Sequence, residues 1–259
     1  SAKPMTALTK ALRRDIASLA EIKGRRKIGA FMAEGTKCVL DTIGAFAVRH
    51  IIATPAWLAT HRLPEDTDII EANRGEIGEM SSMSLAPDVI AVYELPEPAA
   101  FHADDAATQL IVALDRVQDP GNLGTIMRTA DWMGITTVIA SNDTVDCFNP
   151  KVIQATMGAI SRVRVVYGDL PVMLAEAAGT GAEIYGTFLD GDNIYSSRLS
   201  LNGIVVMGNE GRGISPQVAA TVTRRLLIPP YPAGRSTSES LNVATATAIV
   251  LSQFRSRQF

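Results

Sequence analysis

Apolar residues recur along the first third of the chain at spacings that predict helices alternating with short strands. Residues 7–22 place Leu8, Leu12, Ile16 and Leu19 at helical spacing, with cations on the opposite side, which predicts an amphipathic helix. Downstream, we expect strands at 30–35, 48–53, 68–70 and 89–95 and helices at 36–45, 55–61 and 74–83. This alternation predicts a small α/β unit over residues 1–95.

Residues 96–107 interrupt this pattern, because they are rich in proline, alanine and acidic residues. Such a change of composition is typical of a boundary between domains. We therefore expect a first domain at 1–95, a linker at 96–107 and a second domain at 108–259.

The apolar runs of the second domain are longer, and several are nearly continuous. We expect strands at 110–114, 136–140, 163–166, 183–187, 203–207 and 225–228 and helices at 123–133, 151–159, 171–178, 216–220 and 240–254. A nearly continuous apolar run is typical of a parallel strand that is buried on both faces. The predicted fold class is therefore α/β, with a parallel sheet in the second domain.

The composition permits a folded protein with a substantial core, since 47% of the 259 residues are hydrophobic. The formal net charge is −3, so any surface that binds nucleic acid must be local. Four cations lie within five residues at Lys23, Arg25, Arg26 and Lys27. We expect either a loop that contacts RNA phosphates through Arg25, Arg26 and Lys27, or an ordinary solvated turn.

The two cysteines, Cys38 and Cys147, are far apart and lie outside any C-x-x-C pattern. This spacing argues against a zinc site or a disulfide framework, so we expect no metal, two small core residues and a reducing, cytoplasmic location. No apolar run approaches the roughly 18 residues of a membrane span, so we expect no membrane partner.

The first of three candidate functional turns follows the strand that ends at Leu114. Asp-Pro-Gly makes this turn, and Asn122 stands where the N-cap of the next helix is expected. Arg128 lies four residues after Gly124 and three after Thr125, so small residues leave room for a ligand beside its guanidinium. The alternative is that Asn122 is a plain cap and Arg128 a solvated helix residue.

Two further turns follow apolar strands near the end of the chain. Residues 208–213 contain three glycines, so the backbone there must approach another group closely or adopt positive φ. The order G-x-x-G-x-G is not a dinucleotide fingerprint, and the chain has no P-loop. In the last turn we expect Ser238 or Ser240 to cap the final helix, with Asn242 in its first turn. Ligands bind where parallel strands end, so we expect the three turns to meet.

Together these motifs resemble the SpoU, or TrmH-like, RNA ribose 2′-O-methyltransferases of the SPOUT superfamily. The resemblance rests on N-x-G-x-x-R-x-A at 122–130, on M-G-N-E-G at 207–211, and on I-P at 228–229 followed by S-L-N-V at 240–243. It covers about residues 108–257, and residues 150–159 also resemble a family segment, with Thr156 where serine is usual. One departure is that residues 230–239 form a longer spacer than the family pattern has.

For the fold, the resemblance implies a parallel α/β sheet with a C-terminal deep trefoil knot, although protein chains are usually unknotted. F-M-A-E-G at 31–35 is similar to an N-terminal RNA substrate-binding domain of the ribosomal-protein-L30e type. The resemblance also implies a homodimer that packs through the knot region.

The cofactor implied by the resemblance is S-adenosyl-L-methionine, surrounded by Thr187, Gly208, Ile228 and Leu241. The implied reaction moves a methyl group to a ribose 2′-hydroxyl of RNA, and in such a reaction positioning carries much of the rate.

The residue that the resemblance places on the substrate is Arg128. The resemblance implies that Arg128 acts on the 2′-hydroxyl. Because a guanidinium is effectively never deprotonated in proteins, the alternative is that Arg128 grips the adjacent phosphate while that phosphate or a water takes the proton. The resemblance implies that Asn122, Glu210, Ser240 and Asn242 orient the substrate and Arg128.

The expected partner is RNA, with ribosomal RNA ahead of transfer RNA because of the additional N-terminal domain. The main alternative function is a non-catalytic RNA-binding protein that keeps the fold. The presence of Asn122, Arg128, Glu210 and Asn242 together argues against that alternative, since a decayed site is expected to lose some of them.

Overall fold

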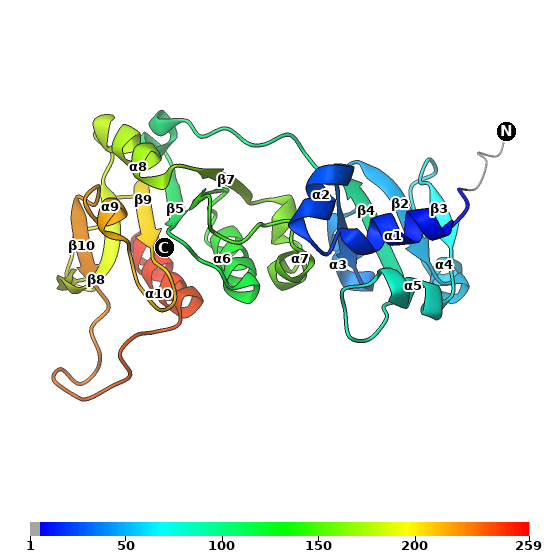
Figure 1. Ribbon diagram of the computed structural model, residues 1–259. Helices are drawn as coiled ribbons and strands as arrows, with labels where there is room; N and C mark the ends of the chain where they lie inside the picture. Colours follow the sequence, from blue (N-terminus) through cyan, green and yellow to red (C-terminus); the bar gives the residue numbers. More distant parts are fainter. Residues whose placement is uncertain (1–5, 259) are drawn as a thin grey trace. The chain divides into compact units, whose positions relative to one another are not determined.

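The protein, described by a computed structural model over residues 6–258, divides into two compact units. The first comprises the chain up to Glu97 together with Asp146–Ser161, and the second comprises Pro98–Val145 together with the chain from Arg162 onward. The elements of both units are labelled in Figure 1.

The first unit is built on a four-stranded sheet in the order β1-β4-β2-β3. Its strands are β1 (Ala30–Glu34), β2 (Val48–Ala53), β3 (Ile69–Glu71) and β4 (Val89–Glu94). β4 pairs antiparallel with β1 and β2, whereas β2 and β3 pair parallel. The helices of this unit are α1 (Lys10–Ser18), α2 (Ile22–Ile28), α3 (Thr36–Thr42), α4 (Pro55–Thr60), α5 (Arg74–Met80) and α7 (Pro150–Thr156).

The basic run that follows α1 is a helix, not the loop expected from the sequence. The single helix predicted over 7–22 ends at Ser18, and the cations lie in α2. Gly24 permits this arrangement, because a Cβ at that position would lie 1.9 Å from the carbonyl oxygen of Ser18. The missing side chain therefore lets α2 pack directly against the end of α1.

Arg25 is buried inside this unit, with only 2% of its side chain exposed. Its Nε and Nη2 donate to Oδ2 of Asp146 at 2.9 and 2.7 Å, and its Nη1 donates to the carbonyl oxygens of Leu19 and Ala20. Every nitrogen of the guanidinium is thus engaged within the fold. The prediction that Arg25 contacts RNA phosphate is therefore wrong.

Residues 146–161 lie in the first unit, although the sequence predicts them in the domain at 108–259. Gln154 Nε2 donates to the carbonyl oxygen of Glu34 at 3.2 Å, and the ring of Phe148 lies 4.7 Å from that of Phe31. Asp146 supplies the acceptor for Arg25. Apolar packing and one buried ion pair thus attach this segment to β1 and α2.

The second unit contains a six-stranded sheet in the order β10-β8-β9-β5-β6-β7. The strands are β5 (Leu110–Leu114), β6 (Thr137–Ser141), β7 (Arg164–Gly168), β8 (Ile184–Asn193), β9 (Gly203–Met207) and β10 (Arg224–Leu227). All neighbouring strands pair parallel, which confirms the predicted parallel α/β sheet. The helices are α6 (Pro120–Trp132), α8 (Leu170–Gly179), α9 (Pro216–Ala219) and α10 (Val243–Arg255).

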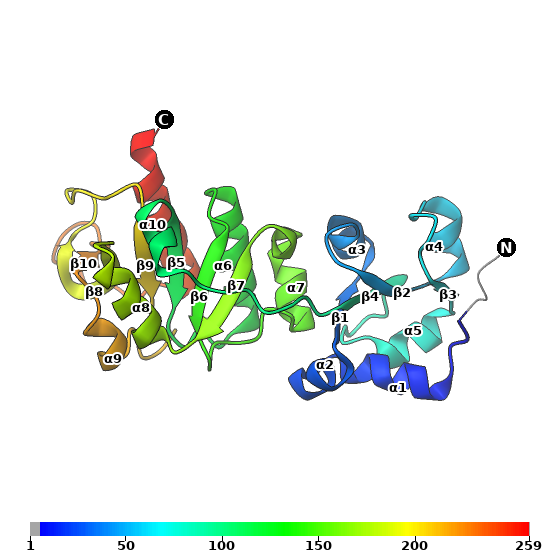
Figure 2. The ribbon, with the colours of Figure 1, turned by 90° about the horizontal axis from the view of Figure 1, so that it is seen from above.

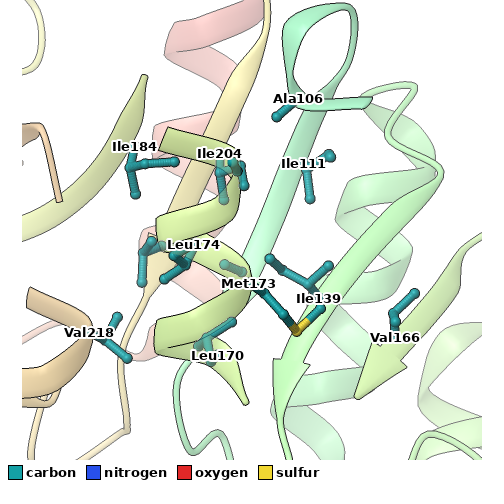
Figure 3. Packing of buried hydrophobic residues seen from close by; sticks show 13 residues of the cluster. Ala106, Ile111, Ile139, Val166, Leu170, Met173, Leu174, Ile184, Ile204 and Val218 are labelled. Carbon is teal, nitrogen blue, oxygen red and sulfur yellow. The ribbon is translucent and has the colours of Figure 1, made fainter. Parts of the chain in front are cut away.

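Helices cover both faces of this sheet: α8 lies on one face, and α6 and α10 pack together on the other (Figure 2). Figure 3 shows how Leu170, Met173 and Leu174 of α8 meet apolar side chains such as Ile111 and Ile204 of the strands. Because both faces are covered, β5, β6 and β9 are buried along their whole length. This burial explains their nearly continuous apolar sequences.

Part of the predicted linker belongs to this core. Residues Ala103–Ala107 form a 3-10 helix, η1, which packs against α8. Ala106 is fully buried among the core residues (Figure 3). Phe101 is packed against the same core. The linker expected at 96–107 is therefore ordered over its second half by apolar contacts that its alanine-rich sequence permits.

Burial raises the pKa of the Cys38 thiol to about 11, and Cys147 is buried. Over residues 6–258, no cluster of three or more His, Cys, Asp or Glu side chains has the arrangement to hold a metal ion. Within the same part of the chain, no helix has the length and apolar character needed to cross a membrane.

Candidate active site

The three candidate turns follow β5, β9 and β10 of the second unit. β9 lies next to β5 in the sheet, and β8 lies between β9 and β10. Because all pairs are parallel, the turns after Leu114, Met207 and Leu227 lie at the same edge. The carboxyl ends of parallel strands are where ligands bind in open α/β sheets.

The turn after β5 clamps the loop after β9. Asp115, which is 2% exposed, accepts a hydrogen bond through Oδ2 from the backbone N–H of Ser215 at 2.6 Å. Arg116 donates from Nη2 to the carbonyl oxygen of Gly213 at 3.2 Å, and its own carbonyl oxygen accepts from Nδ2 of Asn209 at 2.7 Å. These contacts hold Arg116 at a φ of 59°, a conformation that costs about 1 kcal/mol or more outside glycine.

The Gly208–Gly213 loop closes on its own backbone. A Cβ at Gly208 would lie 2.3 Å from the carbonyl carbon of Gly213 and 2.4 Å from the nitrogen of Ile214. Asn209 and Gly213 exchange two backbone hydrogen bonds of 3.0 Å each, and Gly213 has a φ of 66°. The prediction of close backbone approach and positive φ is thus confirmed, and the group approached is the loop itself.

A chain of polar side chains joins the three motifs. Asn122 Nδ2 donates to Oε1 of Glu210 at 3.3 Å, and Asn242 Nδ2 donates to Oδ1 of Asn122 at 2.9 Å. The backbone N–H of Asp119 also donates to Oε1 of Glu210, at 3.2 Å, and Oε2 accepts from Nδ2 of Asn209 at 3.3 Å. Residues separated by 88 and 120 positions in sequence therefore form one hydrogen-bonded network.

The helix caps at this site differ from those predicted. Asp119 is the N-cap of α6 and accepts from the backbone N–H of Asn122 at 2.8 Å, because Pro120 takes the first helical position. Asn242 is the N-cap of α10, where its Oδ1 accepts from the N–H groups of Ala244 and Thr245. The predicted caps Asn122 and Ser238 or Ser240 are wrong. Asn122 is instead free to use its side chain in the network.

Arg128 lies on the exposed face of α6. Its guanidinium forms no hydrogen bond or ion pair with Asn122, Glu210 or Asn242, nor with any other residue over 6–258. The structure therefore places Arg128 on the same helix as Asn122 but leaves its donors available to a ligand.

The residues predicted to surround a cofactor lie partly together. Thr187 directly follows the part of β8 that pairs with β9, Gly208 follows β9 and Ile228 follows β10, and these three strands are neighbours in the sheet. Leu241, with 47% exposure, and Ser240 precede α10 in the exposed segment 230–242, which Figure 1 shows as a long loop. The structure does not bring Ser240 or Leu241 into the hydrogen-bonded network.

Four further residues belong to the site but are not among those predicted from the sequence: Asp115, Arg116, Asp119 and Asn209. Asp115 and Arg116 directly follow a buried strand, and Asp119 precedes Pro120, which is the usual place for a cap. These signals can be recognised in the sequence. The hydrogen-bond partners of the three residues in segment 208–215 cannot, because they are distant along the chain.

Comparisons with known proteins show what this chain is similar to. The SpoU rRNA Methylase family model matches residues 109–252. The 23S rRNA (guanosine(2553)-2′-O)-methyltransferase RlmP of Bacillus subtilis is 28% identical over 235 residues, which cover 90% of this chain and 91% of that protein.

Solved structures match over nearly the whole chain. A TrmH-family protein from Porphyromonas gingivalis is 38% identical with a TM-score of 0.87, over 97% of this chain and 100% of the other. An AdoMet-bound rRNA methyltransferase from Sinorhizobium meliloti is 27% identical with a TM-score of 0.82, over 98% of each chain.

Proposed function

Because this chain belongs to the SpoU rRNA methylase family, we propose that it transfers a methyl group from S-adenosylmethionine to a ribose 2′-hydroxyl of ribosomal RNA. The observation that carries the proposal is the network of Asn122, Glu210 and Asn242, which assembles the three motifs at the ligand-binding edge of a parallel sheet. Relatives named as 23S rRNA methyltransferases support ribosomal RNA over transfer RNA.

The four residues predicted to surround the cofactor fit S-adenosylmethionine in chemical character. Thr187 offers a hydroxyl, Gly208 a backbone without a side chain, and Ile228 and Leu241 apolar surface that is partly exposed. Adenosyl groups need hydrogen bonds at few positions and apolar contact elsewhere, which is how small-molecule sites are generally lined. When bound, the cofactor supplies a methyl group activated by a sulfonium.

Arg128 is the residue we assign to the RNA, as a cation that orients the 2′-hydroxyl or grips the neighbouring phosphate. Glu210 accepts hydrogen bonds on both carboxylate oxygens, from Asp119 and Asn122 on Oε1 and from Asn209 on Oε2, so we assign it a positioning role. Its role is to hold Asn122 and the turn before α6. Asn242 completes that alignment, and Ser240 remains a predicted substrate contact.

The trefoil knot and the homodimer belong to the same proposal. β10 lies at the edge of the sheet, yet α10 packs on α6, which follows the interior strand β5. The C-terminal segment must therefore return past β8 and β9, as a knotted topology requires. Family likeness supports a dimer through this region, an L30e-like RNA-binding role for the first unit and a cytoplasmic location, which all remain predictions.

Calorimetry with S-adenosylmethionine and, separately, with NAD tests the cofactor assignment. We expect binding of the former alone, and absence of that binding would contradict the proposed function. Incubating the protein with ribosomal RNA and labelled S-adenosylmethionine then tests the reaction. RNA binding without transfer of label would favour the non-catalytic alternative.

Replacing Asn242 by aspartate separates its two contacts. Aspartate can still cap α10 through its carboxylate, but it has no N–H to donate to Asn122. We expect methyl transfer to fall by about tenfold to a hundredfold, because catalytic groups lose alignment, while thermal stability stays near that of the wild type.

The matched variant Asn242→Ala removes the cap as well. It is expected to lose similar activity and, in addition, about 1 kcal/mol of stability. Full activity of Asn242→Asp in a steady-state methyl-transfer assay would show that the Asn122 contact is dispensable.

The exposed cations Arg26 and Lys27 are the remaining candidates for phosphate contacts in the first unit. Replacing both by alanine is expected to weaken RNA binding and to reduce the slope of log K against log salt by about 0.7 to 0.9 per lost contact. Filter binding at several salt concentrations measures this slope. Arg74→Ala is the control, because Arg74 is an exposed cation that pairs with Asp88 at 2.8 Å. An unchanged slope in the double variant would show that Arg26 and Lys27 of α2 do not contact RNA phosphates.

A further inference from the structure

A five-residue bulge within β8 leaves the ladder with β10 and then rejoins it. Arg225 of β10 pairs with Gly186 of β8, and the next residue, Leu226, pairs with Asp192. Residues 187–191 therefore have no partner in β10, because they lie between the residues that pair with Arg225 and Leu226. We call them the 187–191 loop, and they begin with Thr187, which the proposed function assigns to the cofactor.

Arg225 holds this loop from the neighbouring strand through two different contacts. Its Cζ lies 3.5 Å from the centroid of the Phe188 ring. Its Nε and Nη2 both donate to Oδ1 of Asp190, at 3.2 and 2.7 Å. The same guanidinium thus contacts the residues on both sides of Leu189, which is 85% exposed at the tip.

Close backbone packing seats the two ends of the loop. A Cβ on Gly191 would lie 2.4 Å from the carbonyl carbon of Leu226, and one on Gly186 would lie 2.8 Å from the ring of Phe188. The glycines let the loop approach β10 and the ring of Phe188 lie over the strand. Between these ends, Arg225 supplies the side-chain contacts that fix the loop's shape.

The strength of this clamp comes from the combination of contacts. Arg225 and Asp190 are 43% and 75% exposed, so their ion pair alone contributes little once solvent screens it. The hydrogen bond from Arg225 lowers the pKa of the Asp190 carboxyl. Stacking on Phe188 adds a cation–π contact to the same planar group.

We propose that Arg225 is a positioning residue for cofactor binding, which holds the 187–191 loop in its binding conformation before S-adenosylmethionine arrives. A loop that is already ordered loses less conformational entropy when a ligand binds. This inference rests on the proposed function, because it takes Thr187 to contact the cofactor. It adds a residue that itself need not touch the cofactor.

The test compares Arg225→Ala with Arg224→Ala in the full-length protein. Successive residues of a strand face opposite sides, and Arg224 contacts the carbonyl oxygen of Arg198 instead of the loop. We expect Arg225→Ala to weaken the binding of S-adenosylmethionine in calorimetry by about three- to tenfold and to speed amide hydrogen exchange within 187–191. Arg224→Ala should leave both unchanged.

Conservative variants separate positioning from general loss of structure. Arg225→Lys keeps the charge but not the planar fork, so its affinity should lie between those of the wild type and Arg225→Ala. Phe188→Leu should weaken binding by itself and add less than its full effect in the Arg225→Ala background, since both remove the same contact. At saturating S-adenosylmethionine, kcat should recover while KM for the cofactor stays raised.

Two outcomes would overturn the inference, and they differ in what they say of the function. If the wild type binds S-adenosylmethionine and Arg225→Ala binds it equally well, the clamp has no role although the proposed function stands. If the wild type binds none, the proposed function fails and the inference fails with it. Equal weakening by Arg224→Ala would show a nonspecific effect of the edge strand and would likewise overturn the proposal.

Discussion

Replacing Arg128 by alanine is expected to lower kcat for methyl transfer by about 10²- to 10⁴-fold while leaving the affinity for S-adenosylmethionine unchanged. The reason is its position: Arg128 is exposed on α6, outside the strand ends assigned to the cofactor, and its donors are free for the RNA. Because Arg128 is exposed and holds no other residue of the described chain, its removal should not disturb the fold.

Steady-state kinetics together with calorimetry measure both parts of this prediction. Arg128→Lys helps to define the role, because lysine keeps the charge without the two-pronged geometry of the guanidinium. A lysine variant that retains substantial activity would favour simple attraction to phosphate, whereas a loss close to that of alanine would favour orientation of the 2′-hydroxyl. Arg164→Ala provides the control, since Arg164 is a half-exposed cation of β7 that pairs with Asp105 at 3.6 Å. Activity of Arg128→Ala equal to that of the wild type would remove Arg128 from the mechanism.

The largest effect on stability is expected from Arg25→Ala, which should destabilise the first unit by about 3 kcal/mol. The substitution leaves the Asp146 carboxylate without its cation and the carbonyl oxygens of Leu19 and Ala20 without a donor. The value lies at the lower end for a broken buried pair, because Asp146 is 22% exposed and water can partly solvate it.

The two tryptophans of the chain allow the two units to be followed separately. Trp57 is buried in the first unit, whereas Trp132 lies in the second and is 87% exposed. In a Trp132→Phe background, fluorescence during urea unfolding reports on the first unit through Trp57. Arg26→Ala is the matched control, because this neighbouring arginine is exposed and should change stability by less than about 0.5 kcal/mol. Equal unfolding midpoints for Arg25→Ala and Arg26→Ala would show that the ion pair between Arg25 and Asp146 does not stabilise the first unit.

The site illustrates how local and distant information combine. The glycines of 208–213 were assigned to close approach or positive φ from their sequence, and the structure shows both at Gly208 and Gly213. The caps were assigned wrongly, because several polar residues near each helix start could fill the role. At α6 the N-cap is Asp119, because Pro120 occupies the first helical position. At α10 the N-cap is Asn242, because its side chain accepts hydrogen bonds from two backbone N–H groups.

The sequence by itself determined the elements of this protein and the order of its motifs. The ranges predicted for β2, β5 and β9 are those observed, because an apolar run bounded by polar or glycine-rich turns is a local property. The motif residues Asn122, Arg128, Glu210 and Asn242 were also identified before their positions in space were known. Parallel pairing followed from the nearly continuous apolar runs.

Only the tertiary structure decided which polar groups are buried and with what partner. From the sequence, Arg25 is expected to be a surface cation, because it lies in a basic run. In the structure it is buried, because Asp146, 121 positions away, supplies the compensating charge. The assignment of 146–161 to the first unit depends on the same contact and on the packing of Phe148 against Phe31. Burial of a charge is decided by its partner, and partners this distant in sequence are joined only by the folded chain.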